Sequence, residues 1–89
     1  MSTTFTTLFG EHPDVRVVEF LAGHPEFDYN LSDLARNAGV SRPAAYKVVR
    51  RLLHRGVLVR TRRVGTSWFY ALNAESPTVR PLLRMGVAR

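Results

Sequence analysis

The side chains with the clearest chemical potential lie in a basic segment in the middle of the chain. Residues 42–55, RPAAYKVVRRLLHR, carry cationic side chains at helical spacing around Tyr46. Arginine and lysine donate hydrogen bonds to phosphate oxygens and to the acceptor edge of guanine. Shortly afterwards, Arg60, Arg62 and Arg63 precede a turn that contains glycine. This pattern indicates a surface that binds a polyanion.

The distribution of charge supports the same interpretation. Residues 1–35 hold six acidic side chains and one basic one, whereas residues 36–89 hold twelve basic side chains and one acidic one. The formal net charge of +6 therefore belongs to one part of the chain. A surface polarised in this way favours a polyanionic partner over uniform, non-specific adhesion.

Other kinds of chemistry find little support in the sequence. His12, His24 and His54 form no i, i+4 pair and the chain has no cysteine, so we expect neither a metal site nor a disulfide framework. No nucleophile, base and orienting group form a local motif, and there is no glycine-rich phosphate loop. We therefore expect no enzyme activity and no cofactor. No eighteen apolar residues run together and no secretory signal is present, so we expect a cytosolic protein without membrane contact.

The size of the chain limits its organisation. A chain of 89 residues has room for one small domain, and at this size it buries only about 60% of the surface that its unfolded form exposes. A second subunit is therefore expected, and we predict a homodimer. We divide the chain into an N-terminal extension at the dimer interface (1–12), a central domain (13–74) and a C-terminal helix available for dimerisation (75–89).

Two helices are predicted before the basic segment. The first runs from about Pro13 to Gly23, because proline suits the first helical position and apolar residues recur at helical spacing. Residues 27–29 are too short for more than an edge strand. The second helix follows Asn30, whose side chain is a suitable N-cap, and ends at Gly39, which can adopt a positive φ.

The basic segment is predicted to form the third and longest helix. Ser41 is its expected N-cap and Gly56 ends it, so that it covers about residues 42–55. Residues 57–73 then read as a β-hairpin around the turn sequence VGTS. A fourth helix falls within Ser76–Ala88 and starts nearer Thr78, which puts Pro81 in its first turn. The fold class is therefore mainly α with a small β-hairpin (α+β).

The stretch LARNAGVSRPAAYKVVRRLLHRGVL, within a longer similarity over Pro13–Asn73, resembles winged helix-turn-helix transcription regulators of the ArsR and MarR type. The closer likeness is to short winged-helix regulators common in archaea. The resemblance implies a three-helix core with a hairpin wing, a third helix that faces DNA, and dimers formed through terminal helices. By the same resemblance Leu34, Ala35, Val40, Ala45, Val49 and Leu52 are structural. The sequence lacks the cysteine metal motif of many ArsR-type sensors.

Residues and resemblance together define a candidate site for double-stranded DNA. Side chains near the N-terminus of an inserted helix reach base edges in the major groove, and a hairpin can follow the backbone or enter the minor groove. The candidate residues on the third helix are Ser41, Arg42, Pro43, Ala44, Tyr46, Lys47, Arg50 and Arg51. Those on the hairpin are Arg60, Arg62, Arg63, Thr66 and Ser67.

The sequence leaves some alternatives open. The hairpin arginines are also typical of charges that protect an edge strand from aggregation, and Trp68, Phe69 and Tyr70 favour core or dimer packing over base stacking. The main hypothesis is a sequence-specific transcription regulator. Its alternatives are an architectural or plasmid-maintenance protein that coats DNA, and a winged domain that docks on an acidic protein. RNA is a weaker candidate, because its A-form major groove is too narrow for a helix.

Overall fold

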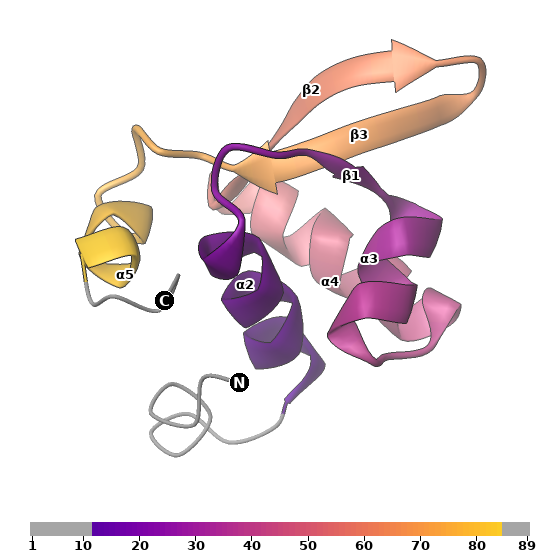
Figure 1. Cartoon of the computed structure of the whole chain (residues 1–89), viewed down its shortest axis with the longest axis horizontal. Coiled ribbons are helices and arrows are strands. Elements are labelled where there is room, and N and C mark those ends of the chain that lie inside the picture. The colour runs from indigo at the N-terminus through magenta and orange to yellow at the C-terminus, as the bar shows by residue number, and fades with distance from the viewer. Residues whose placement is uncertain (1–11, 85–89) are drawn as a thin grey trace.

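The computed structural model describes residues 12–84, which form helices and a small sheet (Figure 1). In chain order the elements are α2 (Pro13–Gly23), β1 (Tyr29–Asn30), α3 (Leu31–Ala38), α4 (Arg42–His54), β2 (Leu58–Val64), β3 (Ser67–Leu72) and α5 (Val79–Arg84). The predicted α+β class is confirmed. The predicted N-terminal extension lies outside the described residues except for His12.

Short-range signals set the ends of α3 and α4 as the sequence predicts. The Asn30 side chain accepts a hydrogen bond from the Asp33 amide at 2.8 Å and caps α3. Gly39 ends α3 with a φ of 73°, in the left-handed region that glycine adopts without a side-chain clash. Ser41 Oγ then accepts from the Ala44 amide at 3.2 Å and caps α4. Two helices are thereby joined by a turn of only three residues, Gly39–Ser41.

The core forms where α2, α3 and α4 meet the sheet. Val17, Leu21, Leu34, Val48 and Leu58 are each at most 2% exposed. Val48 and Val49 are both buried, because α4 packs against both α2 and α3. Val40 is half-buried and packs against this core. The buried apolar stripe of α4 leaves its opposite face exposed.

The sheet has three antiparallel strands in the order β1-β3-β2. The predicted edge strand is present but lies at Tyr29–Asn30 rather than at residues 27–29, because pairing with Tyr70 and Phe69 sets its position. Strands β2 and β3 form the predicted hairpin, and Gly65 supplies a φ of 62° in its turn. In Figure 1 the hairpin tip extends beyond the helices.

The last helix closes the opposite end of the molecule (Figure 1). Helix α5 begins at Val79, so Pro81 falls in its first turn as predicted. Val79 is fully buried, and Leu82 and Leu83 pack partly against the core. Within residues 12–84, the structure contains no helix with the length and apolar character to span a membrane.

Candidate nucleic-acid interface

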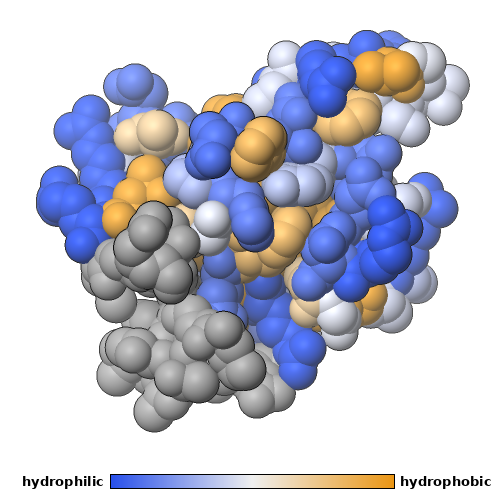
Figure 2. All heavy atoms as spheres, in the orientation of Figure 1, coloured by the Kyte–Doolittle hydropathy of each residue, from blue (hydrophilic) through white to orange (hydrophobic). Residues whose placement is uncertain are grey.

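The exposed face of α4 carries most of the residues that the sequence nominated. Ser41, Arg42, Pro43, Lys47 and Arg50 are exposed, as is Tyr46, and Ala44 is half-buried. These side chains face outward because Ala45, Val48, Val49 and Leu52 occupy the buried face of the same helix. In Figure 2, which shows the face of the molecule that carries α3, hydrophilic residues predominate over α3. The arrangement is a rigid, capped helix that presents cations to solvent.

Tyr46 and Arg50 form a contact on this face. Tyr46 is 51% exposed, which is unusual for a large aromatic side chain, and the Arg50 guanidinium lies 5.8 Å from the centre of its ring. A cation over an aromatic face is attracted by the ring quadrupole. The contact favours an orientation of Arg50 over the ring, and the Arg50 side chain remains exposed.

The cationic face continues along the second half of the helix. Lys47, Arg50, Arg51, His54 and Arg55 line a shallow, open depression. The four of these side chains that lie within α4 recur every three or four residues, so they project from one side of the helix. Such a row of donors has the chemistry to bind phosphate oxygens.

Arg51 differs from its neighbours, because it binds a carboxylate of the protein itself. Its Nε donates to Asp14 Oδ2 at 3.2 Å, and its Nη2 donates to Asp14 Oδ1. The hydrogen bonds from Arg51 to Asp14 raise the pKa of Arg51 above its ordinary value. Because Asp14 lies in the first turn of α2, this pair joins α2 to α4. The structure therefore gives Arg51 a bracing contact that its position in the sequence did not indicate.

The three hairpin arginines also separate into two kinds. Arg60 and Arg63 lie over the Trp68 ring, at 5.0 and 5.7 Å from its centre. Arg62 instead lies 4.2 Å from the centre of the Phe69 ring and forms an ion pair with Asp28. Thr66 and Ser67 are exposed at the hairpin tip. Of the three consecutive aromatic residues, Tyr70 packs against the core as predicted. Trp68 and Phe69 instead contact the arginines of β2.

Among the described residues, most cations without a carboxylate partner lie on α4 and the hairpin. In the part of the chain that the structure describes, the acidic side chains Asp14, Asp28, Asp33 and Glu75 each pair with an arginine. Within the same part, six cations of α4, β2 and the residue after α4 have no ion pair with a carboxylate, namely Arg42, Lys47, Arg50, Arg55, Arg60 and Arg63. Arg84, at the end of α5, is also without such a pair among residues 12–84. Most of the unneutralised charge thus coincides with the nominated surface.

The histidines lie apart from one another in the fold. His24 contacts aromatic rings, with centroid distances of 5.0 Å to Phe20 and 6.5 Å to Tyr29. His54 lies on α4, and His12 precedes α2. Among residues 12–84, no three His, Cys, Asp or Glu side chains gather in a group that could hold a metal ion.

Comparison with known families identifies the domain. Residues 15–62 match the model of the IclR helix-turn-helix domain, and this match spans more than half of the chain. The chain belongs to the IclR helix-turn-helix family. This is a family of winged helix-turn-helix DNA-binding domains, so the predicted architecture is confirmed. The more specific likeness to the ArsR and MarR types and to short archaeal regulators stays a prediction.

Two solved structures have a similar fold. One is the AntR antimony-specific transcriptional repressor, with 26% identity and a TM-score of 0.62 over 81% of this chain. The other is NadR in complex with 4-hydroxyphenylacetate, with 22% identity and a TM-score of 0.66 over 96% of this chain. The aligned regions span 60% of the AntR chain and 66% of the NadR chain. Among curated proteins, comparison by sequence gave no match.

The sequence did not indicate the contacts of Asp28 with the hairpin. Asp28 accepts hydrogen bonds from two residues of β2, yet it looked like an ordinary acidic residue of a short edge strand. Its partners are more than thirty positions away along the chain. Only the pairing of β1 with β3 brings them together, so no local pattern could have indicated the contact.

Proposed function

We propose that this chain regulates transcription by binding double-stranded DNA in a sequence-specific manner. The observation that carries the proposal is that six cations without a carboxylate partner among residues 12–84 lie on or directly after α4 and in the hairpin. These are the two elements that a winged helix-turn-helix domain presents to DNA. The family match supports DNA as the polyanion. A cytoplasmic location follows from this role.

In this proposal α4 enters the major groove. A groove about 12 Å wide admits one helix, and the residues of its first turns reach the base edges. Arg42, Pro43 and Ala44 lie at that end of α4, with Tyr46 and Lys47 one turn further along. Arginine and lysine are suited to guanine O6 and N7, and an aromatic or methyl group is suited to the thymine methyl. The Ser41 hydroxyl and the backbone amide of Arg42 contact phosphate.

The hairpin supplies a second contact. Arg60 and Arg63, with Thr66 and Ser67 at the tip, lie along the backbone or in the adjacent minor groove. These contacts release counterions and contribute affinity that is independent of sequence. Bases are therefore read by α4, while the hairpin increases affinity and fixes orientation.

The domain acts as a homodimer in this account. One chain carries a single α4, and a two-fold pair of chains presents two such helices to successive major grooves, about 34–36 Å apart. The location of α5 away from the hairpin tip supports this arrangement, because α5 is then available for contact with a second copy (Figure 1). Regulation follows from occupancy of the DNA site.

The test is selection of bound fragments from genomic DNA, followed by affinity measurements on the selected duplex and on a shuffled duplex of the same composition. Both are titrated in mobility-shift assays at about 50 and 200 mM salt. The proposal predicts that the selected duplex binds about a thousandfold or more tightly than the shuffled one.

Two other results would contradict sequence-specific regulation. Equal affinity for both duplexes, with a footprint that spreads as protein is added, would indicate a DNA-coating protein. Weak binding that disappears at the higher salt concentration would indicate a module that binds an acidic protein.

A further inference from the structure

We propose that Asp28 is a positioning residue that selects which arginines of the hairpin contact DNA. It holds a β-bulge at Thr61, and the bulge places Arg60 and Arg63 on the side of the sheet that faces DNA while it turns Arg62 to the other side. The DNA contact in this inference rests on the proposed function. The positioning itself rests on geometry within the chain.

The pairing of β2 with β3 is irregular between Arg60 and Arg62. Arg60 pairs with Tyr70, but the next pairs are Arg62 with Phe69 and Arg63 with Trp68. Thr61 is therefore an extra residue with no partner on β3, as in a β-bulge. A regular strand alternates its side chains, so without the bulge Arg60 and Arg62 would share one side. With the bulge, Arg60 and Arg63 share it.

The two sides of the sheet have different surroundings. Tyr70 and Leu72 face the helices and pack against the core, and Trp68 is on the same side because it lies two residues before Tyr70. Arg60 and Arg63 contact Trp68, so they also lie on the helix side, near the hairpin tip that extends beyond the helices (Figure 1). This is the side of the sheet on which α4 lies. Both arginines are thus available to a duplex that contacts α4.

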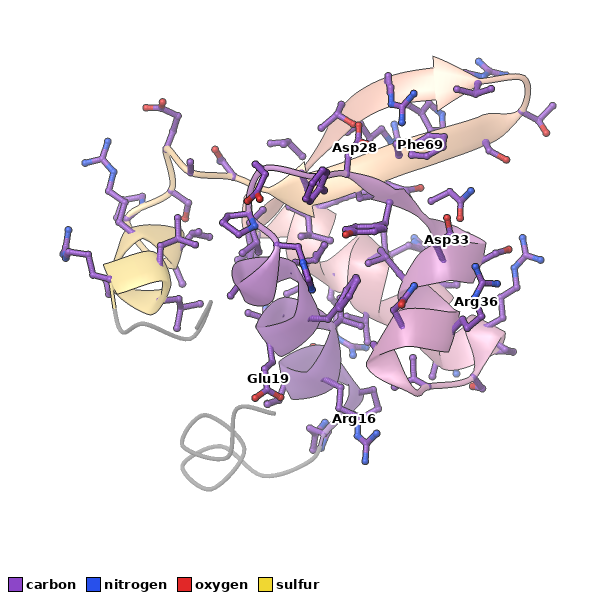
Figure 3. All side chains as sticks on the ribbon, in the orientation of Figure 1. Arg16, Glu19, Asp28, Asp33, Arg36 and Phe69 are labelled. Carbon is purple, nitrogen blue, oxygen red and sulfur yellow. The ribbon has the colours of Figure 1, made fainter. Side chains whose placement is uncertain are left out.

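Asp28 binds the bulge from the opposite side. Its Oδ2 accepts a hydrogen bond from Thr61 Oγ1 and another from Arg62 Nε at 3.0 Å, while its Oδ1 accepts from Arg62 Nη2 at 3.2 Å. Asp28 and Phe69 lie on the side of the sheet away from the helices (Figure 3). The guanidinium of Arg62 lies over Phe69, so it is held by a carboxylate on one edge and by a ring on its face.

The environment of the carboxylate is consistent with a structural role. The Asp28 side chain is only 20% exposed, which limits the competition from water for its hydrogen bonds. The hydrogen bonds from Arg62 and Thr61 lower the pKa of Asp28 below its ordinary value. Asp28 therefore binds both Thr61, the bulge residue, and Arg62, the residue that follows it. Because Asp28 precedes β1, and β3 lies between β1 and β2, these contacts cross β3.

A positioning role for Asp28 predicts an effect opposite in sign to that of simple electrostatics. Removal of a negative charge from a protein that binds DNA strengthens binding, because repulsion of phosphate decreases. If Asp28 positions the hairpin, its removal instead weakens binding, since Arg60 and Arg63 lose their common orientation. The matched control is Glu26, an exposed acidic residue only two positions away that has no ion pair with a described side chain.

The first experiment uses the free protein. Trp68 is the only tryptophan of the chain, so its fluorescence reports directly on the side of the hairpin that carries Arg60 and Arg63. Asp28→Ala should change the Trp68 emission, whereas Glu26→Ala should leave it unchanged. Asp28→Asn is a second variant that keeps an acceptor for Thr61, and circular dichroism verifies that each variant is folded. Identical emission from all variants would overturn the inference.

The second experiment measures affinity for a fluorescein-labelled, random-sequence DNA duplex. Asp28→Ala should bind on the order of tenfold more weakly than wild type, with a salt dependence that is shallower by about one unit for each phosphate that the variant no longer neutralises. Glu26→Ala should bind as wild type or more tightly. Equal or tighter binding by Asp28→Ala would contradict the inference. Absence of duplex binding by the wild type would instead refute the proposed function, and the Trp68 emission would still decide the role of Asp28.

Discussion

Arg50 and Arg51 are adjacent in the sequence and have opposite surroundings in the structure. Arg50 lies over an exposed tyrosine and has no carboxylate partner among the described residues, whereas Arg51 is bound by Asp14. A guanidinium that is already paired with a carboxylate has fewer free donors, and its charge is partly neutralised, so it attracts phosphate less. Charge at a sequence position is therefore a poor guide to which arginine binds DNA.

This difference predicts unequal effects of two similar substitutions. Arg50→Ala should weaken DNA binding clearly, because it removes an available cation from the exposed face of α4. Arg51→Ala should weaken it much less and should instead lower the temperature of unfolding, because α2 loses its ion pair with α4. Fluorescence anisotropy with the selected duplex and thermal unfolding give both values. Equal losses of affinity would show that the pair with Asp14 does not restrict Arg51.

The depressed pKa of Asp28 predicts a dependence of stability on pH. A carboxyl group whose pKa is lowered by folding stabilises the folded state above its unfolded pKa, here about 3.8, and this contribution is lost as the pH falls through the folded pKa. Wild type should therefore exceed Asp28→Asn in free energy of unfolding at about pH 6, and the difference should shrink towards about pH 3. Urea unfolding at the two pH values measures it. A difference that is constant with pH would exclude the ionised carboxylate as its source.

The turn between α3 and α4 depends on one backbone conformation. Gly39 has a φ of 73°, and a Cβ atom at this position would lie 3.0 Å from Nη1 of Arg16. The flexible end of the arginine can move, so the main cost of a side chain here is the left-handed backbone itself, about 1–2 kcal/mol. Gly39→Ala should lower the free energy of unfolding by about that amount in urea titrations. A neutral or stabilising effect would mean that α4 tolerates another entry angle.

Local signals and long-range contacts explain what the sequence could predict. Asn30, Gly39 and Ser41 act within three or four residues of themselves, so the ends of α3 and α4 were predicted correctly. The position of β1, the bulge at Thr61 and the partners of Asp14 and Asp28 depend on contacts between distant parts of the chain. Periodicity contains no information on these pairings, so it does not distinguish Arg62 from the other two arginines of the hairpin.

At the scale of the whole fold, most cations of residues 12–84 that have no carboxylate partner lie on α4 and β2, while α5 lies at the other end (Figure 1). A dimer formed through the end that carries α5 would leave both α4 helices exposed to one duplex. It should protect two half-sites about 10 base pairs apart, related by two-fold symmetry. Footprinting on the selected duplex, together with light scattering of the free protein, tests this prediction. A single unsymmetrical footprint from a monomer would contradict the dimer.

Methylation interference on the selected duplex tests most directly whether α4 reads the major groove. Guanine N7 lies in the major groove and adenine N3 in the minor groove, so methylation marks the two grooves separately. Methylation of particular guanines should block binding of the wild type. Arg42→Ala or Lys47→Ala should abolish the interference at one of these guanines and cost roughly 1–3 kcal/mol of binding free energy. Interference only from methylated adenines, or from no base, would contradict insertion of α4.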